Sequence, residues 1–388
     1  MEKVTFEVET ITPMFLAGND QFETNVTQKE ENDIERTFTD WHIRAEIRAA
    51  SLRGLMRYWE RALVGGVALT LKDVQKREQA LFGSTDYGSK IIARVTQPIK
   101  SSQIFHKERI YKDASEERKN GIIGRNYLFW SMDKSGKESR HNFKAARFYY
   151  PRNTTFSVTI SIHGHDDTVK QKLNQGIVAF WLLTHLGGIG SRSRRCAGSL
   201  MVRISSDKNE YKLPEKLLPL FQPAASAEAL QEQLKQGINV ARELYNLNSN
   251  SPQSPQKFDI LAKGACRIWV LHNSWQTDDE AMGTIGKSLQ DYRVSIKSEK
   301  GMYALIRRKV FGLPIISKYT PSQYKKELED QRMASPLMLK VARLKNNQFA
   351  VIAVLFKTLD KNGKSPNYQL IEQWIAKFPA SQILKVTL

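Results

Sequence analysis

Three arginines spaced four residues apart lie in the segment 51–61 and could bind the phosphates of a nucleic acid. Arg53, Arg57 and Arg61 fall at positions i, i+4 and i+8, so they form one stripe if this segment is an α-helix. Guanidinium groups donate paired hydrogen bonds to phosphates and also pack over bases. Arg48 adds a positive charge just before the segment. A solvated basic helix face is the alternative interpretation.

The same segment carries a glycine where a helix would not favour one. Gly54 lies inside the predicted helix, where glycine costs about 1 kcal/mol relative to alanine. It therefore indicates a close approach by a backbone or a ligand. Ser51 is a suitable N-cap for the helix. The apolar residues of the opposite face have helical spacing and are Leu52, Leu55, Met56, Trp59 and Leu63.

A second basic segment is the glycine-rich run 187–198, GGIGSRSRRCAG. Its glycines permit positive φ and can present N–H groups to an anion. No acidic residue lies between Asp167 and Asp207, so the charge of the run has no local compensation, and a phosphate backbone would supply it. A flexible surface loop is the alternative. The candidate contacts are Gly187, Gly188, Gly190, Ser191, Arg192, Ser193, Arg194, Arg195 and Gly198.

The sequence gives few signs of nucleotide hydrolysis, metal binding or catalysis. The run lacks the GxxxxGK[ST] pattern and follows a helix, which argues against a nucleotide-hydrolysing loop. His163 and His165 precede Asp166 and Asp167, an arrangement that we interpret as a capping turn before a helix and not as a metal or catalytic site. We therefore predict no catalytic residue, no metal and no cofactor.

The composition points to a polyanionic partner. The 388 residues carry a formal net charge of +19 with a pI of about 9.7, which favours salt-dependent binding of nucleic acid. Cys196 and Cys266 have no CxxC partner, so they predict neither a zinc site nor a disulfide framework and fit a reducing compartment. The chain begins with an alternating strand and has no long apolar run. We expect a cytoplasmic protein without membrane contact.

The periodicity predicts an α+β protein of two domains. Strands are predicted at 3–9, 41–47, 91–97, 156–162 and 200–204, with helices at 52–63, 74–82 and 168–186. This is a β-α-β-β-α-β unit, 1–205, interrupted by polar insertions at 18–40 and 101–152, of which the second has some hairpin character. A helical linker segment follows, 206–257, and a similar domain occupies 258–388.

Five segments, in order, resemble the RAMP proteins of CRISPR systems. They are ETITPMFLAG (9–18), IRAASLRGLMRYWERAL (47–63), LFGS (81–84), GGIGSRSRR (187–195) and ASPLML (334–339). Together they look like the subfamily formed by the first RAMP subunit of type III-B (Cmr) effector complexes. Cys196-Ala197 departs from the family pattern of glycine followed by a bulky residue.

The resemblance implies two tandem ferredoxin-like (RRM-like) domains and a non-catalytic subunit. Such a subunit would bind the 3′ part of the guide RNA beside other RAMP subunits, and contact with target RNA is left open. Matching positions in the helix motif are Arg48, Ser51, Arg53, Gly54, Arg57 and Trp59. A metal-independent endoribonuclease that processes CRISPR RNA is the first alternative function. A scaffold that binds acidic proteins is the second.

Overall fold

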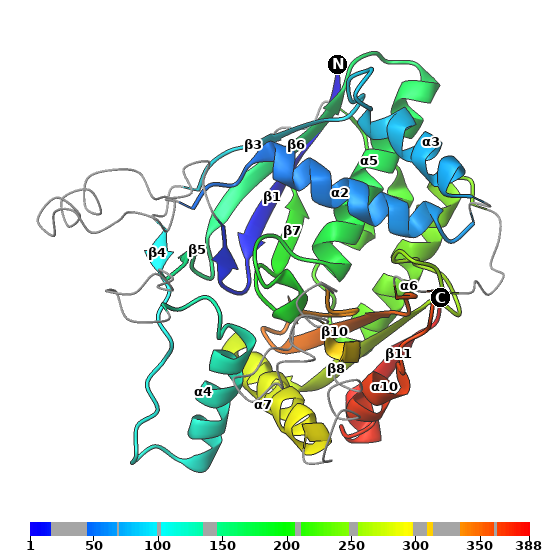
Figure 1. Ribbon diagram of the computed structural model, residues 1–388. Helices are drawn as coiled ribbons and strands as arrows, with labels where there is room; N and C mark the ends of the chain where they lie inside the picture. Colours follow the sequence, from blue (N-terminus) through cyan, green and yellow to red (C-terminus); the bar gives the residue numbers. More distant parts are fainter. Residues whose placement is uncertain are drawn as a thin grey trace, which may run out of the picture.

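The computed structural model contains two four-stranded antiparallel sheets, each with its own helices (Figure 1). It describes residues 1–16, 45–67, 70–98, 102–134, 146–205, 211–247, 255–297, 309–312, 334–360 and 363–388. The predicted insertion 18–40 therefore lies outside the described residues. Among the helices of the described part, none is long and apolar enough to cross a membrane.

The first sheet is built in the predicted β-α-β-β-α-β order. Its strands pair in the order β3-β6-β1-β7. The elements are β1 (Glu2–Thr10), α2 (Ala49–Val64), α3 (Leu71–Phe82), β3 (Ile92–Val95), β6 (Thr155–Ile162), α5 (Asp167–Leu186) and β7 (Leu200–Ile204). The predicted strand 41–47 is wrong at its end, because residues 45–47 belong to no strand. Residues 41–44 are not described.

The second sheet repeats this succession. Its strands pair in the order β11-β8-β10-β9, so the last strand again lies beside the first. The elements are β8 (Cys266–Trp275), α7 (Asp278–Lys297), η3 (Lys309–Phe311), β9 (Leu337–Arg343), β10 (Phe349–Phe356), α10 (Gln369–Ile375), η4 (Ala380–Gln382) and β11 (Ile383–Val386). The prediction of two similar α+β units is thus confirmed at the level of element order.

The segment between the sheets is helical, as predicted, and it is packed. It contains η2 (Glu215–Phe221) and α6 (Ala227–Leu244). The apolar side chains of α6, Leu230, Leu234 and Ile238, are buried in one cluster with residues of α5 and β8. Because α6 contacts both units, the boundaries 1–205, 206–257 and 258–388 stay a prediction.

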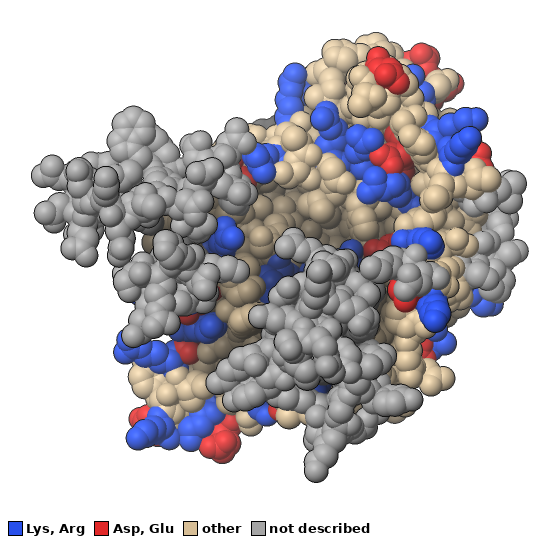
Figure 2. Space-filling view, viewed as in Figure 1, with Lys and Arg blue, Asp and Glu red and all other residues tan. Residues whose placement is uncertain are grey.

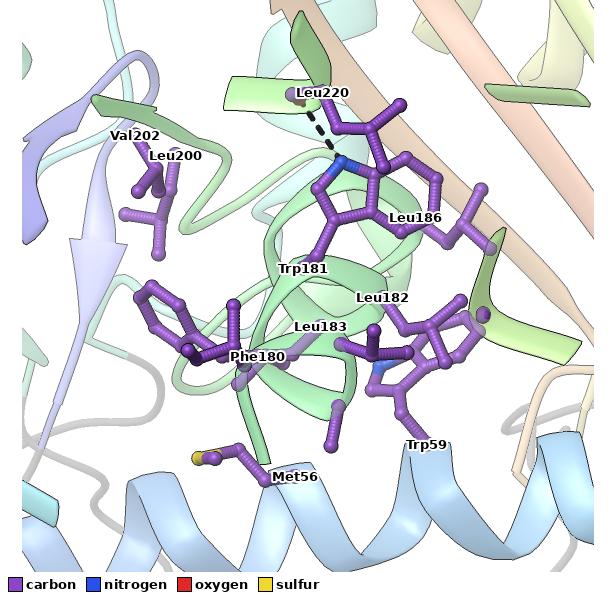
Figure 3. Packing of buried hydrophobic residues seen from close by; sticks show 14 of the residues in the cluster. Met56, Trp59, Phe180, Trp181, Leu182, Leu183, Leu186, Leu200, Val202 and Leu220 are labelled. Carbon is purple, nitrogen blue, oxygen red and sulfur yellow. Dashed lines mark hydrogen bonds between the residues drawn. The ribbon is translucent and has the colours of Figure 1, made fainter. Parts of the chain in front are cut away.

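The second sheet is buried on both faces, which explains its continuous apolar strands. In β10, Ile352 and Val354 join the core of the first unit, whereas Val351 and Ala353 pack with α7 and α10. Figure 3 shows the centre of the first core, where side chains of α2 and α5 meet. There the Trp181 indole N–H donates to the Leu220 carbonyl oxygen at 3.0 Å.

The described part of the 101–152 insertion forms an arm that docks on the second unit. It contains β4 (Gln103–Ile104), α4 (Glu116–Leu128) and β5 (Phe148–Tyr150), and β5 pairs with both β4 and β2 (Met14–Phe15). The hairpin character is therefore present, but helix α4 was not predicted. Figure 1 shows α4 beside α7.

The contact between α4 and α7 is made by glycines from both helices. A Cβ added to Gly124 would overlap the carbonyl oxygen of Gly283, and one added to Gly286 would overlap the carbonyl oxygen of Gly124. The two backbones thus approach more closely than any side chain would permit. This contact fixes the arm to α7.

We expect Gly124→Ala to destabilise the protein by about 1–3 kcal/mol, because the new methyl group has no space. Thermal or urea denaturation would measure the loss. Gly121→Ala on the same helix is the matched control. Its Cβ would meet only the end of the Arg125 side chain at 3.6 Å, so we expect a neutral effect or a gain of up to about 1 kcal/mol. Equal effects of the two substitutions would contradict the close backbone contact.

Candidate nucleic-acid interface

The predicted arginine stripe lies on helix α2, which starts one turn earlier than its sequence suggested. Arg48 occupies the N-cap position, is exposed, and its carbonyl oxygen accepts from the Leu52 N–H at 3.1 Å. The prediction that Ser51 caps the helix is therefore wrong: Ser51 lies exposed in the first turn. The cap itself uses no side-chain oxygen.

Two of the three stripe arginines share a carboxylate from α3. Arg57 Nε donates to Glu78 Oε1 at 2.6 Å, and Arg61 lies 3.2 Å from Glu78 Oε2. Arg53 is exposed and forms no ion pair with a described residue. The stripe therefore has three guanidinium groups, and the one carboxylate that pairs with them among the described residues, Glu78, binds two of the three. Figure 2 shows Lys and Arg side chains gathered over α2 and α3 with an acidic group among them.

The carboxylate of Glu60, on the same helix as the arginines, is not on this surface. Glu60 is buried, and burial, followed by repulsion from Glu78, raises its pKa well above the ordinary value. Burial thus keeps this carboxylate off the exposed face of α2. Glu78 was missed because it lies on the next helix, where no local pattern links it to the arginines.

The predicted site residues Gly54 and Trp59 lie on opposite sides of α2. Apart from the neighbouring residues and turns of α2 itself, no heavy atom of the described residues lies within 4 Å of a Cβ built on Gly54, so none of their packing requires this glycine. Its surface is open to a ligand. Trp59 is 1% exposed and packs against Phe356, with its ring centroid 5.9 Å from that ring. The assignment of Trp59 as a direct contact is therefore corrected to a packing role.

The loop 187–198 uses its glycines to fit against other backbone segments. Gly190 and Gly198 have positive φ, and a Cβ on either would overlap a carbonyl oxygen, of Phe15 and Ile189 respectively. A Cβ on Gly187 would lie 2.6 Å from the Trp59 indole nitrogen, and one on Gly188 would lie 2.9 Å from the Gly198 carbonyl oxygen. These contacts give the glycines a structural function.

Many N–H groups of the loop are also occupied. The Ser191 N–H donates to the Phe15 carbonyl at 2.8 Å, the Cys196 N–H to the Leu339 carbonyl at 2.8 Å, and the Gly198 N–H to the Pro13 carbonyl at 2.8 Å. The expectation that these N–H groups face an anion is therefore wrong. Ser193 starts a short 3-10 turn, η1 (Ser193–Arg195), which follows Arg192 in the left-handed region.

The loop arginines bind protein groups. Arg195 is buried and donates to the carbonyl oxygens of Leu337 and Phe311 at 3.1 and 3.2 Å and to the Ser335 hydroxyl at 2.9 Å. Burial lowers its pKa to about 10, so it stays charged at neutral pH. Arg192 Nε donates to the Leu128 carbonyl oxygen at 2.9 Å.

Arg194 completes a network that joins three segments. Its guanidinium lies 3.3 Å from Asp259 Oδ2, donates to the Ser335 carbonyl oxygen and packs over the Tyr58 ring. The Tyr58 hydroxyl donates to the same carboxylate. The predicted absence of acidic compensation is therefore wrong, because Asp259 supplies it from 65 residues away. The helix and the loop do meet, but through Tyr58 and Trp59 and not through the arginine stripe.

The histidine cluster behaves as a capping turn, as predicted. The Asp166 side chain accepts from the Val169 N–H at 2.8 Å and caps α5. His165 Nδ1 lies 3.0 Å from Glu2 Oε1, at the start of β1. This contact ties His165 to the end of the first strand.

Comparisons with known proteins agree with this architecture. Residues 7–200, half of the chain, match the model of the RAMP superfamily. The chain belongs to the RAMP superfamily. The matched range contains both the α2 stripe and the glycine loop.

Two curated RAMP relatives come from Pyrococcus furiosus. The CRISPR system Cmr subunit Cmr1-1 is 27% identical over 321 residues, which cover 81% of each chain. The CRISPR system Cmr subunit Cmr1-2 is 29% identical over 209 residues, covering 53% of this chain and 97% of the relative. Among solved structures, apo Cmr1 from the same organism has a TM-score of 0.58 at 19% identity, with 100% and 99% of the two chains covered. A chain of a type III-B Cmr-beta complex bound to cognate target RNA has a TM-score of 0.56 at 14% identity, with 97% and 99% covered.

We expect Arg195→Ala to lower the free energy of unfolding by about 2–4 kcal/mol, because it removes the guanidinium donor from the Phe311 carbonyl oxygen and one of the two donors from the Leu337 carbonyl oxygen. Arg53→Ala, which removes an exposed arginine without a partner among the described residues, should change it by less than about 0.5 kcal/mol. Urea denaturation of both variants is the measurement. A small effect at Arg195 would show that the loop is not held by these bonds.

A buried lysine near the loop gives a pH dependence of stability. Lys340 on β9 donates from Nζ to the Leu200 carbonyl oxygen at 2.9 Å, and burial lowers its pKa from 10.5 to about 7. At a pH between these two pKa values, Lys340 is protonated in the unfolded chain and has lost its proton in the folded chain. The unfolded state then binds more protons, so stability rises with pH.

We expect Lys340 to contribute up to about 1.4 kcal/mol of stability per pH unit between pH 7 and 10, and nothing to the slope below pH 7. Lys340→Met should lack this contribution. Urea denaturation of the two proteins at pH 6, 7, 8.5 and 10 tests the difference. Parallel stability curves above pH 7 would rule out the depressed pKa.

Proposed function

We propose that this RAMP protein is a non-catalytic, RNA-binding subunit of a type III-B CRISPR effector complex in antiviral defence. It would bind the 3′ part of the guide RNA in the cytoplasm, beside other RAMP subunits. The observation that carries the proposal is the α2 stripe, in which Arg53 and Arg61 are exposed, Arg57 is half-buried, and one carboxylate, Glu78, pairs with Arg57 and Arg61. Phosphates would complete the compensation.

The geometry of α2 supports sequence-independent contacts. Side chains at i, i+4 and i+8 lie about 6 Å apart along the helix axis, close to the spacing of successive phosphates in an extended strand. Gly54, with open space around it, would let the sugar-phosphate chain approach the helix backbone between Arg53 and Arg57. The charge of +19 would add a long-range attraction that salt weakens.

The comparisons support the choice of partner. The two relatives are named as Cmr subunits, and similar solved chains belong to Cmr-beta complexes bound to cognate target RNA. RNA and other Cmr subunits are therefore the partners that we propose for this chain. In this proposal the loop 187–198 holds α2 against the second unit, and the exposed stripe contacts the RNA.

The test is binding of single-stranded guide RNA at a series of salt concentrations. We expect the triple variant R53A/R57A/R61A to bind at least tenfold more weakly, and the slope of log K against log salt to fall by about 2. Each lost phosphate contact should remove about 0.7 from that slope. Filter binding with labelled RNA gives both quantities.

A control variant that loses three positive charges elsewhere tests whether the weaker binding comes from the α2 surface or from the lower net charge. K216A/K235A/K385A removes three positive charges from η2, α6 and β11 and should leave affinity and slope close to those of the wild type. Gly54→Ala gives a second check, because it should stabilise α2 by up to about 1 kcal/mol and still weaken RNA binding. Equal losses for the two triple variants would overturn the proposal that α2 is the contact surface.

A further inference from the structure

The arm formed by residues 102–134 lies at a corner of the molecule (Figure 1). It exposes large aromatic side chains. Trp130 is 61% exposed and Tyr111 is 56% exposed. The other described tryptophans are all buried: Trp59, Trp181, Trp269, Trp275 and Trp374. An exposed tryptophan, where the other described tryptophans are buried, indicates a ligand surface.

The fold of the arm brings the start of the basic segment 106–112 next to the turn that carries Trp130. The Lys107 N–H donates to Asp133 Oδ2 at 3.2 Å, and the Glu108 N–H donates to Asn126 Oδ1 at 3.1 Å. Lys107 and Glu108 therefore lie beside the end of α4 and the turn that carries Trp130. The segment then runs back toward the start of α4, where the Ala114 N–H donates to the Tyr111 carbonyl oxygen just before the N-cap residue Ser115. Its sequence, HKERIYK, alternates cationic residues with the exposed Tyr111.

The single carboxylate of this segment is already paired. Glu108 forms an ion pair with Arg125 of α4, which also lies 3.6 Å from Asp279 of the second unit. Arg109 and Lys112 are exposed, and neither side chain forms an ion pair or hydrogen bond with a described residue. Exposed cations and exposed aromatic rings spread along one arm, from the start of α4 to the turn after it, match a strand of unpaired nucleotides, which offers phosphates and bases in alternation.

The arm is held in place, so the surface is ready for binding. The glycine contact fixes α4 on α7, and Phe129, next to Trp130, is buried between Phe15 and Phe105. Ordering therefore costs little when a ligand binds. An acidic protein helix would pair with Arg109 and Lys112 but would leave the flat rings of Trp130 and Tyr111 without matching partners, so unpaired RNA fits better.

We propose that the arm binds single-stranded RNA, with Trp130 and Tyr111 stacking on unpaired bases and Arg109 and Lys112 contacting the adjacent phosphates. This site is separate from the α2 stripe, and the inference rests on the proposed function only in that the ligand is RNA. Stacking does not select a base, so the contact would tolerate any sequence.

Trp130 itself reports on the contact. We expect short single-stranded RNA to quench the fluorescence of the full-length protein and to protect it from iodide, and duplex RNA of equal length to do so at least tenfold less effectively. The quenched signal should disappear in Trp130→Phe, whose RNA affinity should stay within about threefold of the wild type because a phenyl ring still stacks. Trp130→Ala should lose about tenfold in affinity. Leu218→Ala, which removes an exposed apolar side chain elsewhere, should lose none.

Two results would overturn the inference: unchanged affinity of Trp130→Ala, or protection of Trp130 from iodide by an acidic protein partner after the RNA has been digested. These outcomes are distinct from failure of the proposed function. If the α2 triple variant binds RNA normally while Trp130→Ala does not, the arm is the RNA contact and α2 is not. If Trp130→Ala binds RNA normally while the α2 triple variant does not, α2 is the RNA contact and the arm is not.

Discussion

The buried guanidinium of Arg195 is the interaction on which the arrangement of the two sheets depends. A buried charge costs several kcal/mol unless its surroundings compensate it. Here the compensation comes from the carbonyl oxygens of Leu337 and Phe311 and from the Ser335 hydroxyl, all in the second unit. Because the guanidinium is planar and its donors point in fixed directions, it sets the position of the start of β9 relative to the loop.

The rest of the loop follows from that constraint. For Arg195 to reach the second unit, the loop backbone must lie against the carbonyl groups of Phe15 and Ile189. Gly190 and Gly198, which make these two contacts, have the positive φ that such a close approach requires. The same path places Gly187 against Trp59, so α2 is held on its inner face. Its outer face, with the arginine stripe, is left exposed. The buried guanidinium of Arg195 thus helps to position the arginine stripe on the surface of α2.

The periodicity of the sequence predicted most of the strands and helices, because burial on one face or two leaves a local pattern. The continuous apolar run of β10 and the spacing of Leu52, Met56 and Leu63 on α2 are examples. The site was predicted less well. Asp259 lies 65 residues from Arg194, and no window of the sequence joins them. Helix α4 was missed because Gly121 and Gly124 weaken its own helical signal, whereas the helix is stabilised by its contact with α7.

The loop arginines were wrongly predicted to contact RNA because the sequence does not distinguish an arginine that binds protein groups from one that is exposed to solvent. The glycine and arginine run is recognisable in sequence because it builds the junction, and a structural requirement of this kind restricts residue types more tightly than binding to a flexible polyanion does. An arginine already bonded to carbonyl oxygens would have to break those bonds to bind a phosphate, and it would gain little in exchange. Contacts with RNA are therefore expected from groups whose hydrogen bonds are with water in the free protein, such as Arg53 on α2 and Arg109 on the arm. Such residues leave no motif beyond their charge and spacing.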